Sequence, residues 1–206
     1  MKTKCKILYI VFVVITNFVA NAQSFQLGGQ IGLDIANTYY VNRVEYMDKL
    51  YYPMISYNVN FVISYKISNV GITCEPGLIQ KGAIAKYDDE RFRNQINYIQ
   101  FPLLINYHVT ENLYFSIGPE LSYMISANIK DEDGKFDNLE FYDTRLELSG
   151  IVDISYNIFK NLDIGVRYNH GITNIMKATF VDQYGNELDD SMIFNQYFQL
   201  FLKFKK

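Results

Sequence analysis

The sequence contains only two cysteines and two histidines, and it has no tryptophan, in 206 residues. Cys5 lies in an N-terminal segment that we expect to be removed, so Cys74 is the one cysteine expected in the mature chain. A single thiol excludes an internal disulfide. Cys74 occupies an apolar position of a predicted strand, which favours a buried or lipid-facing thiol over a catalytic nucleophile.

The chain after Ala22 lacks a hydrophobic run of the roughly 20 residues that a membrane-spanning helix needs. Met1–Ala22 has an apolar centre, Ile7–Ile15, between three lysines and an Ala-Asn-Ala cleavage motif. This pattern is typical of a secretory signal peptide, and we expect residues 1–22 to be cleaved. A membrane anchor is the alternative, but the apolar run is too short for it. Residues 23–206 are then one mature domain.

An excess of positive charge is also absent. The formal net charge of the whole chain is −3. Without the three lysines of the signal peptide, 16 basic residues remain against 22 acidic ones, which gives −6. This balance argues against a basic face for nucleic acid, and no nucleic-acid partner is expected.

The sequence does have long stretches in which apolar and polar residues alternate. Between Tyr98 and Ile125 almost all the odd positions are apolar, and the even ones are mostly polar, small or proline. A period of two predicts strands. The three residues Thr110–Asn112 suit a turn that places Val109 and Leu113 on the same face of a hairpin.

The same alternation predicts eight strands in all, joined by connections that are alternately long and short. One short connection is a two-residue turn, Ser68-Asn69, that pairs Ile67 with Val70. The predicted strands are Phe25–Ile35, Ile55–Ile67, Val70–Lys81, Tyr98–Val109, Leu113–Ile125, Arg145–Tyr156, Leu162–Asn169 and a last one that ends at Phe204. The predicted long loops are Asn37–Pro53, Ala83–Gln95, Ala127–Asp143 and Ile172–Ser191.

The predicted strands reach about ten residues, whereas strands of soluble proteins most often have about five or six. A tilted strand that crosses a membrane needs about 9 to 11 residues, and strands can span a bilayer only as a closed barrel. We therefore predict an all-β fold, an eight-stranded antiparallel up-and-down transmembrane barrel with short periplasmic turns and four long extracellular loops. A soluble, periplasmic, lipocalin-like ligand-binding barrel is the alternative.

The compositions of the two faces favour the membrane barrel. Tyrosines lie near the strand ends of the apolar face, as in the aromatic girdles of outer-membrane barrels. The polar face mixes small residues with charges of both signs, which suits a narrow interior in which ions pair. The predicted interior ionic network is Lys66, Glu75, Glu120, Arg145, Glu147, Asp153, Arg167 and Lys203.

Five segments resemble the PorT-like outer-membrane β-barrel family of Bacteroidetes, and together they extend over essentially the whole mature chain. They are Glu75–Gly82 (EPGLIQKG), Tyr98–Tyr107 (YIQFPLLINY), Ile117–Tyr123 (IGPELSY), Gly165–Gly171 (GVRYNHG) and Gln199–Phe204 (QLFLKF). The resemblance implies an eight-stranded barrel in the outer membrane. The founding member is associated with type IX secretion and gliding, but most relatives have no assigned activity. The chain departs from the pattern at its end, Phe204-Lys205-Lys206, which is not a terminal aromatic.

Eight strands leave an interior that side chains can fill, so a porin-like channel is not expected. His108 and His170 are predicted at opposite ends of the barrel and cannot share a metal. We therefore expect no catalytic residues, no cofactor and no metal. A minor alternative is a hydrolase site in the outer loops, built from His170, Asp189, Asp190 and Ser191.

The long loops are the better candidates for function, because a rigid barrel presents them to the exterior. The first is rich in tyrosine, which is favoured at binding surfaces. We predict a non-enzymatic envelope structural, assembly or secretion-associated component, with a surface adhesin or receptor as the alternative. The expected partners are outer-membrane lipid, the barrel-assembly machinery and periplasmic chaperones during insertion, and an envelope protein bound by the loops. The candidate partner-binding residues are Tyr39, Tyr40, Tyr46, Tyr51 and Tyr52.

Three of the four prolines, Pro76, Pro102 and Pro119, fall on three neighbouring predicted strands. Proline has no N–H to donate to a strand ladder. We expect a bulge that bends the wall at these prolines; a weak seam that faces a partner is the alternative.

Overall fold

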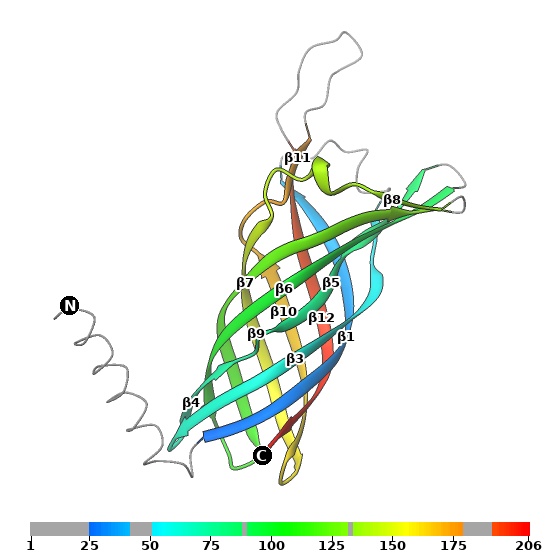
Figure 1. Cartoon of the computed structure of the whole chain (residues 1–206). Helices are drawn as coiled ribbons and strands as arrows, with labels where there is room; N and C mark the ends of the chain where they lie inside the picture. The colour runs from blue at the N-terminus through cyan, green and yellow to red at the C-terminus, as the bar shows by residue number, and fades with distance from the viewer. Residues whose placement is uncertain (1–24, 42–50, 88–89, 132–133, 179–190) are drawn as a thin grey trace, which may run out of the picture.

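The computed structural model describes residues 25–41, 51–87, 90–131, 134–178 and 191–206. The predicted signal peptide, Met1–Ala22, and Tyr46 lie outside these residues. The described chain forms one closed antiparallel sheet, in which the first long strand pairs with the last (Figure 1). The wall contains β1 (Phe25–Val41), β3 (Met54–Ile67), β4 (Val70–Cys74), β5 (Gly77–Tyr87), β6 (Glu90–His108), β7 (Leu113–Lys130), β9 (Leu146–Phe159), β10 (Leu162–Gly171) and β12 (Ser191–Lys205).

β4 and β5 together make one strand of the wall, so the barrel has the eight strands that the sequence predicts. Cys74 pairs with Ile63 and Gly77 pairs with Asn60, in an unbroken register. The hydrogen-bond ladder to β3 is interrupted between β4 and β5, because Pro76 has no N–H to donate. Its carbonyl still accepts the amide of Phe61 at 2.8 Å. The predicted eight-stranded antiparallel barrel is confirmed.

Two of the three expected short connections form as predicted, whereas the third, expected at Asn157–Asn161, is shorter because β9 continues to Phe159. Ile67 pairs with Val70 around Ser68, whose φ of 55° is the left-handed conformation that a two-residue hairpin turn requires. The Val109 amide donates to the Leu113 carbonyl at 2.9 Å, which closes the second turn. These turns lie with the chain's C-terminus at one end of the barrel, and β2 (Tyr51–Tyr52), β8 (Lys135–Asp137) and β11 (Met176–Ala178) lie toward the other (Figure 1). We call these the turn end and the outer end.

The bulge expected at the prolines is not there. Pro102 pairs with Glu120 as predicted, and the register of β6 and β7 shifts instead between Asn97 and Tyr98. Ile125 of β7 is the extra residue at that point. The sequence pattern gives no sign of this shift, because Ile125 continues the apolar alternation of β7.

The charged segment Ala83–Gln95 is strand over most of its length, so the prediction of a loop there is wrong. β5 continues to Tyr87 and β6 begins at Glu90, and these two residues pair. The hairpin projects beyond the barrel together with the end of β7 (Figure 1). The charged residues of this hairpin indicate that both of its faces are solvated. They do not indicate that the backbone is a loop. The short strands β2 (Tyr51–Tyr52) and β8 (Lys135–Asp137) extend this projecting sheet on its two sides.

The three other predicted loops are also shorter than expected. β1 continues to Val41, β7 continues to Lys130, and the last predicted loop contains β11 (Met176–Ala178), which pairs with β12. A single 3-10 turn, Leu139–Phe141, follows β8.

The outward face of the wall is apolar and exposed, as a lipid-facing surface must be. Leu33, Ile55 and Ile117 are 63%, 70% and 61% exposed. No helix among the described residues is long and apolar enough to span a membrane. The exposed face also carries tyrosines toward both ends of the wall, at positions 57, 123 and 168 and at positions 65, 107 and 156.

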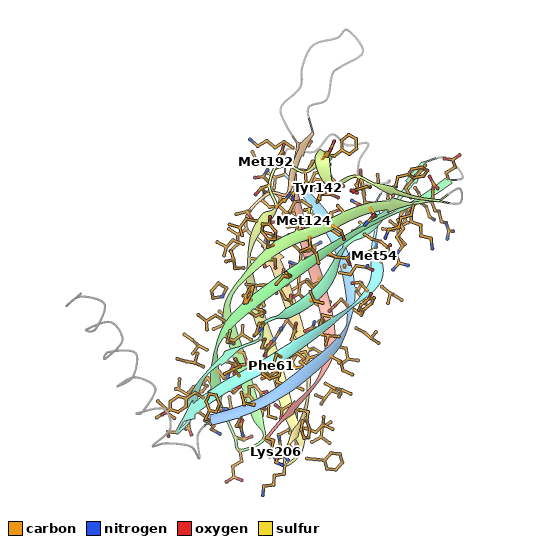
Figure 2. The ribbon with its side chains drawn as sticks, in the orientation of Figure 1. Met54, Phe61, Met124, Tyr142, Met192 and Lys206 are labelled. Carbon is orange, nitrogen blue, oxygen red and sulfur yellow. The ribbon has the colours of Figure 1, made fainter. Side chains whose placement is uncertain are left out.

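The inward face is polar over much of its length and apolar at the outer end. Figure 2 shows Met54, Met124 and Tyr142 in the upper part of the molecule. Met54 and Met124 belong to a buried apolar layer inside the barrel. Its other members are Ala36, Ile79, Ile96, Tyr98, Ala127, Ile175, Ile193 and Tyr197.

We expect Ile117→Arg to destabilise the barrel in a bilayer by about 2–4 kcal/mol, because it places a charge near the middle of the lipid-facing band. Ile117 lies between Ile105 and Val152 on that face. Urea titration of folding into phosphatidylcholine vesicles measures the change. Asn112→Arg, in an exposed turn, is the matched control. Equal stability of the two variants would contradict a lipid-facing role for Ile117.

Candidate functional site

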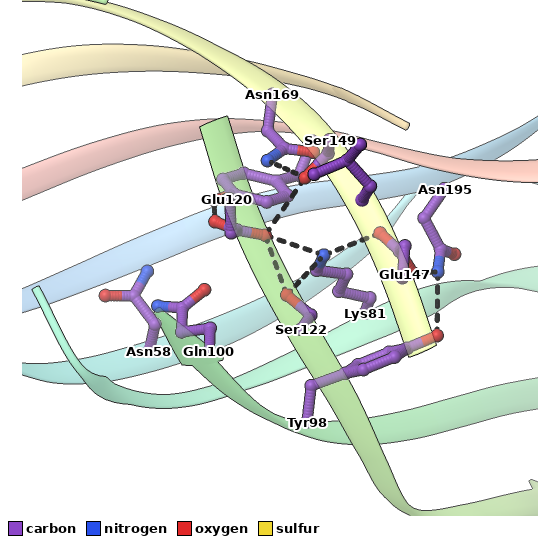
Figure 3. Close-up of polar contacts among 12 residues, drawn as sticks. Asn58, Lys81, Tyr98, Gln100, Glu120, Ser122, Glu147, Ser149, Asn169 and Asn195 are labelled. Atoms are coloured by element: carbon purple, nitrogen blue, oxygen red, sulfur yellow. Dashed lines mark hydrogen bonds and ion pairs between the residues drawn. The ribbon is translucent and has the colours of Figure 1, made fainter. Parts of the chain in front are cut away.

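The interior contains a group of three ions, Lys81, Glu120 and Glu147, which we call the Lys81 cluster (Figure 3). The Lys81 ammonium lies 2.9 Å from Glu120 Oε1 and 2.7 Å from Glu147 Oε1, and all three side chains are buried. The residues come from β5, β7 and β9, which are not all neighbours in the closed wall, so the cluster joins strands across the interior. Alternation on each strand turns these side chains inward.

Hydrogen bonds satisfy the remaining carboxylate oxygens of the Lys81 cluster. Tyr197 donates its hydroxyl to Glu120 Oε2 at 2.8 Å. Asn195 donates its amide to Glu147 Oε2 at 2.7 Å and to the Tyr98 hydroxyl at 3.0 Å. Figure 3 shows Lys81 between its two carboxylates, with Tyr98 and Asn195 beside Glu147. Buried charges are tolerated when they are paired and hydrogen-bonded in this way.

Four ions nearer the turn end form a second group, the Arg167 cluster. It contains Arg167, Lys203, Glu75 and Asp153. The Arg167 Nη2 lies 2.7 Å from Glu75 Oε2 and 2.8 Å from Asp153 Oδ2, and Lys203 Nζ lies 2.7 Å from Glu75 Oε1. Two cations therefore neutralise two carboxylates. The Phe201 ring adds a cation–π contact to both cations, at 5.2 Å from Arg167 and 5.0 Å from Lys203.

Six of the eight residues predicted for the interior network are thus in the two clusters, and two are not. Arg145 is exposed at the surface, because β9 begins only at Leu146 and the alternation does not extend back to Arg145. Its assignment to the network is wrong. Lys66 is half-buried and lines a polar recess of about 180 Å³ at the turn end, with His108, Asp163 and Lys205.

The sequence-based network omitted four buried or half-buried ions. Lys81 is the centre of one cluster, and Asp163 pairs with Lys205 at 2.7 Å. Asp34 is held by amide groups, two bonds of 2.9 Å from Asn58 and one of 2.8 Å from Gln199. Lys81 and Asp34 both occupy polar positions of the predicted alternation, so the same signal that identified Glu75 could have found them.

The tyrosines predicted as one partner-binding loop are divided between two faces of the wall. Tyr39 faces outward, stacks on His170 at 4.7 Å and on Phe194 at 5.0 Å, and donates its hydroxyl to the Gly171 carbonyl at 2.7 Å. Tyr40 lies 5.0 Å from the Tyr51 ring and packs against the apolar layer inside.

The remaining described tyrosine of this set, Tyr52, lies under the Lys86 ammonium, 4.5 Å from it. The described tyrosines do not form one continuous surface. Tyr39 instead extends the outer aromatic girdle, because it faces outward and stacks on His170 and Phe194.

The residues of the hypothetical hydrolase site do not come together where they are described. His170 pairs with Gln196 of β12, and its exposed side chain contacts Tyr39 and Tyr168. Ser191 is buried, lies five residues before Gln196 on the same strand, and faces the opposite side. Asp189 and Asp190 lie outside the described residues. His108 is at the other end of the barrel, beside Tyr114, and the described residues contain no group of metal-ligating side chains.

We expect Arg167→Ala to destabilise the folded barrel by about 3–5 kcal/mol, because it leaves Asp153 buried without its cation. The midpoint of thermal unfolding in detergent, followed by the shift in gel mobility between folded and unfolded protein, measures the loss. Arg145→Ala removes the same charge from an exposed position and serves as the control. If both variants unfold at the same temperature, the Arg167 cluster does not stabilise the fold.

A family model for the outer membrane protein beta-barrel domain matches residues 21–177. Neisserial surface protein A has 15% sequence identity and a TM-score of 0.50, with 88% of this chain and 97% of that chain covered. The attachment invasion locus protein Ail of Yersinia pestis has 11% identity and a TM-score of 0.45, with 88% and 99% covered. OprG of Pseudomonas aeruginosa has 11% identity and a TM-score of 0.40, with 89% and 95% covered.

No curated protein matches the chain. The match to the family model extends over most of the sequence, and the first of these structures shares the fold. Membership of an outer-membrane family sets aside the soluble, lipocalin-like alternative. The chain belongs to the outer membrane protein beta-barrel domain family.

Proposed function

We propose that this outer-membrane barrel is not an enzyme and not a pore, and that it acts through its outer end as a structural, assembly or secretion-associated component of the envelope. The filling of its interior is the observation that carries this proposal. The Arg167 cluster, the Lys81 cluster and the apolar layer follow one another along the inside of the wall. Each layer is built from side chains that contact one another across the interior, which leaves the outer end as the surface available for partners.

A resemblance to the PorT-like barrels supports the proposal of an envelope role. We propose that the chain belongs to that branch of the family, and that a cleaved signal peptide and the usual assembly machinery bring it to the outer membrane. Four of the five resembling segments contribute ions to the two clusters: Glu75 and Lys81, Glu120, Arg167, and Lys203. The shared segments therefore coincide with the filled interior.

A surface adhesin or receptor is the second candidate, and the projecting sheet favours it. β5 and β6 pair as far as Tyr87 and Glu90, and β8 adds a further strand to β7. This sheet extends past the rest of the wall at the outer end (Figure 1). An ordered extension of this kind presents a surface to molecules outside the cell.

We expect the wild-type protein to show no stepwise conductance in a planar lipid bilayer, because side chains fill the interior of an eight-stranded barrel. Arg167→Ala is expected to behave in the same way, since it leaves the Lys81 cluster and the apolar layer in place. Single-channel recording at both polarities measures this. Regular conductance steps in the wild type would contradict a closed interior, and steps only in the variant would make Arg167 a gate.

We expect a variant with a shortened β5–β6 hairpin to fold normally and to lose the interaction of the outer end with its partner. Replacing Lys86–Arg91 by Asn-Gly joins Ala85 to Phe92, which are already paired, through a two-residue turn. Cross-linking in intact cells reports envelope partners, and adhesion of the cells to host-type surfaces reports receptor activity. Loss of the cross-links to envelope partners supports the envelope role, and loss of cell adhesion supports the adhesin. Unchanged results in both assays would contradict both candidates.

A further inference from the structure

The outward face of β6 changes in character toward the outer end. Ile99 and Phe101 are exposed apolar residues of the lipid-facing band. The next outward residues along the strand are Asn97 and Gln95, and after them come two arginines, Arg93 and Arg91. The wall thus goes from apolar to amide to cationic along a single strand.

The amide positions form a continuous polar belt across three strands. Gln80 of β5 donates to the Asn97 side chain at 3.1 Å, and Asn97 donates to the Ser126 hydroxyl of β7 at 2.9 Å. Gln95 donates to Gln80 at 3.4 Å. This belt separates the apolar band from the cations. Its place corresponds to the polar headgroup region of a bilayer.

The strand register gathers cations from four strands on this same face. Arg93 pairs with Lys130 and Lys130 pairs with Lys135, in a row across β6, β7 and β8. On the neighbouring pair of strands, Lys86 lies opposite Arg91. We call this surface the basic face; it consists of Lys86, Arg91, Arg93, Lys130 and Lys135.

No carboxylate neutralises the basic face within the described part of the chain. None of its five cations forms an ion pair with a described residue. Asp137 is the one described carboxylate on the face, and it accepts the Leu139 amide at 2.9 Å. Like charges placed directly opposite each other on paired strands destabilise a sheet. A bound anion would remove this repulsion.

The other side of the outer end has a different character. There the outward residues are aromatic, with Tyr39 stacked between His170 and Phe194. Five cations gather on the β5–β8 side, next to an apolar band that contacts acyl chains, whereas Arg145 and Lys177 are single exposed cations elsewhere at the outer end. A ligand that fits both surfaces has an anionic head and an apolar body.

We propose that the basic face binds the phosphate groups of a phosphorylated lipid of the outer leaflet. The lipid's acyl chains would lie against the apolar band below, beside Ile99 and Phe101, and its polar head would cross the amide belt. The guanidinium group of Arg91 suits phosphate, because it can donate two parallel hydrogen bonds. Arg93 donates its Nη2 to the Ile55 carbonyl at 2.7 Å, so it contributes mainly its positive charge. Lys130 and Lys135 add positive charge beside them. The inference is independent of whether the protein acts as an envelope component or as an adhesin.

Native mass spectrometry of protein released from nanodiscs tests the proposal with two probes, lipid A that carries its phosphates and the same lipid after dephosphorylation. We expect the wild type to retain the phosphorylated lipid. The variant Arg91→Gln/Arg93→Gln/Lys130→Gln should bind it about 100-fold more weakly, at roughly tenfold or less per cation removed. Binding by the wild type should also weaken as sodium chloride is raised from about 50 to 500 mM.

A matched control removes three lysines at the turn end, Lys66→Gln/Lys160→Gln/Lys206→Gln, and should retain the lipid like the wild type. The gel-mobility shift of each variant shows that it is folded. Equal retention by the wild type and the basic-face variant would overturn the proposal, and so would equal binding of the dephosphorylated lipid. Displacement of the lipid by a few millimolar inorganic phosphate would also overturn it, since that would indicate a site for the free anion.

Discussion

The pairing of buried charges inside a closed wall is the constraint on which the rest of this structure depends. Charges in a low-dielectric interior are tolerated only when each has a partner with good geometry. Arg167 on β10 meets Glu75 at the end of β4, and Lys81 on β5 meets Glu147 on β9. These contacts join parts of the chain that lie far apart in the sequence, so they tie the two halves of the barrel together across its centre.

The order of the layers along the interior follows from the same constraint. The ions of the two clusters lie inside the lipid-facing part of the wall, and each has a partner of opposite charge, although Arg167 Nη1 and Asp153 Oδ1 have no hydrogen-bond partner. The apolar layer around Met54, Met124 and Ile193 lies above them toward the outer end, and the polar recess around Lys66 and Lys205 lies at the turn end. An apolar layer directly above the ions keeps outside water away from them, which strengthens their attraction. The barrel interior is therefore a core, built to hold the wall closed.

Alternation predicts the strands and the face on which each residue lies, and the strand lengths and the composition of the two faces are also needed to predict a membrane barrel. It located Glu75, Glu120 and Arg167 inside before any contact was known. It failed where the alternation stops at a strand end, as at Arg145, and where a bulge inserts a residue without breaking the pattern, as at Ile125. The loop predicted from charge is wrong at Lys86 and Arg91, because charged residues also fit a strand whose faces are solvated, and these two residues pair. Which cation meets which carboxylate depends on the stagger of the strands around the barrel, and no single strand's sequence contains that information.

The segments that resemble the PorT-like family also bear on where function lies. They contain Lys81, Glu120, Arg167 and Lys203, which hold the interior together, and none of the cations of the basic face. The resemblance therefore rests on residues that close this barrel. It gives no information about the outer end, where the β5–β6 hairpin and the basic face are built from other segments. The residues that close this barrel and the surface that it offers to a lipid or a protein partner therefore lie in different segments of the chain.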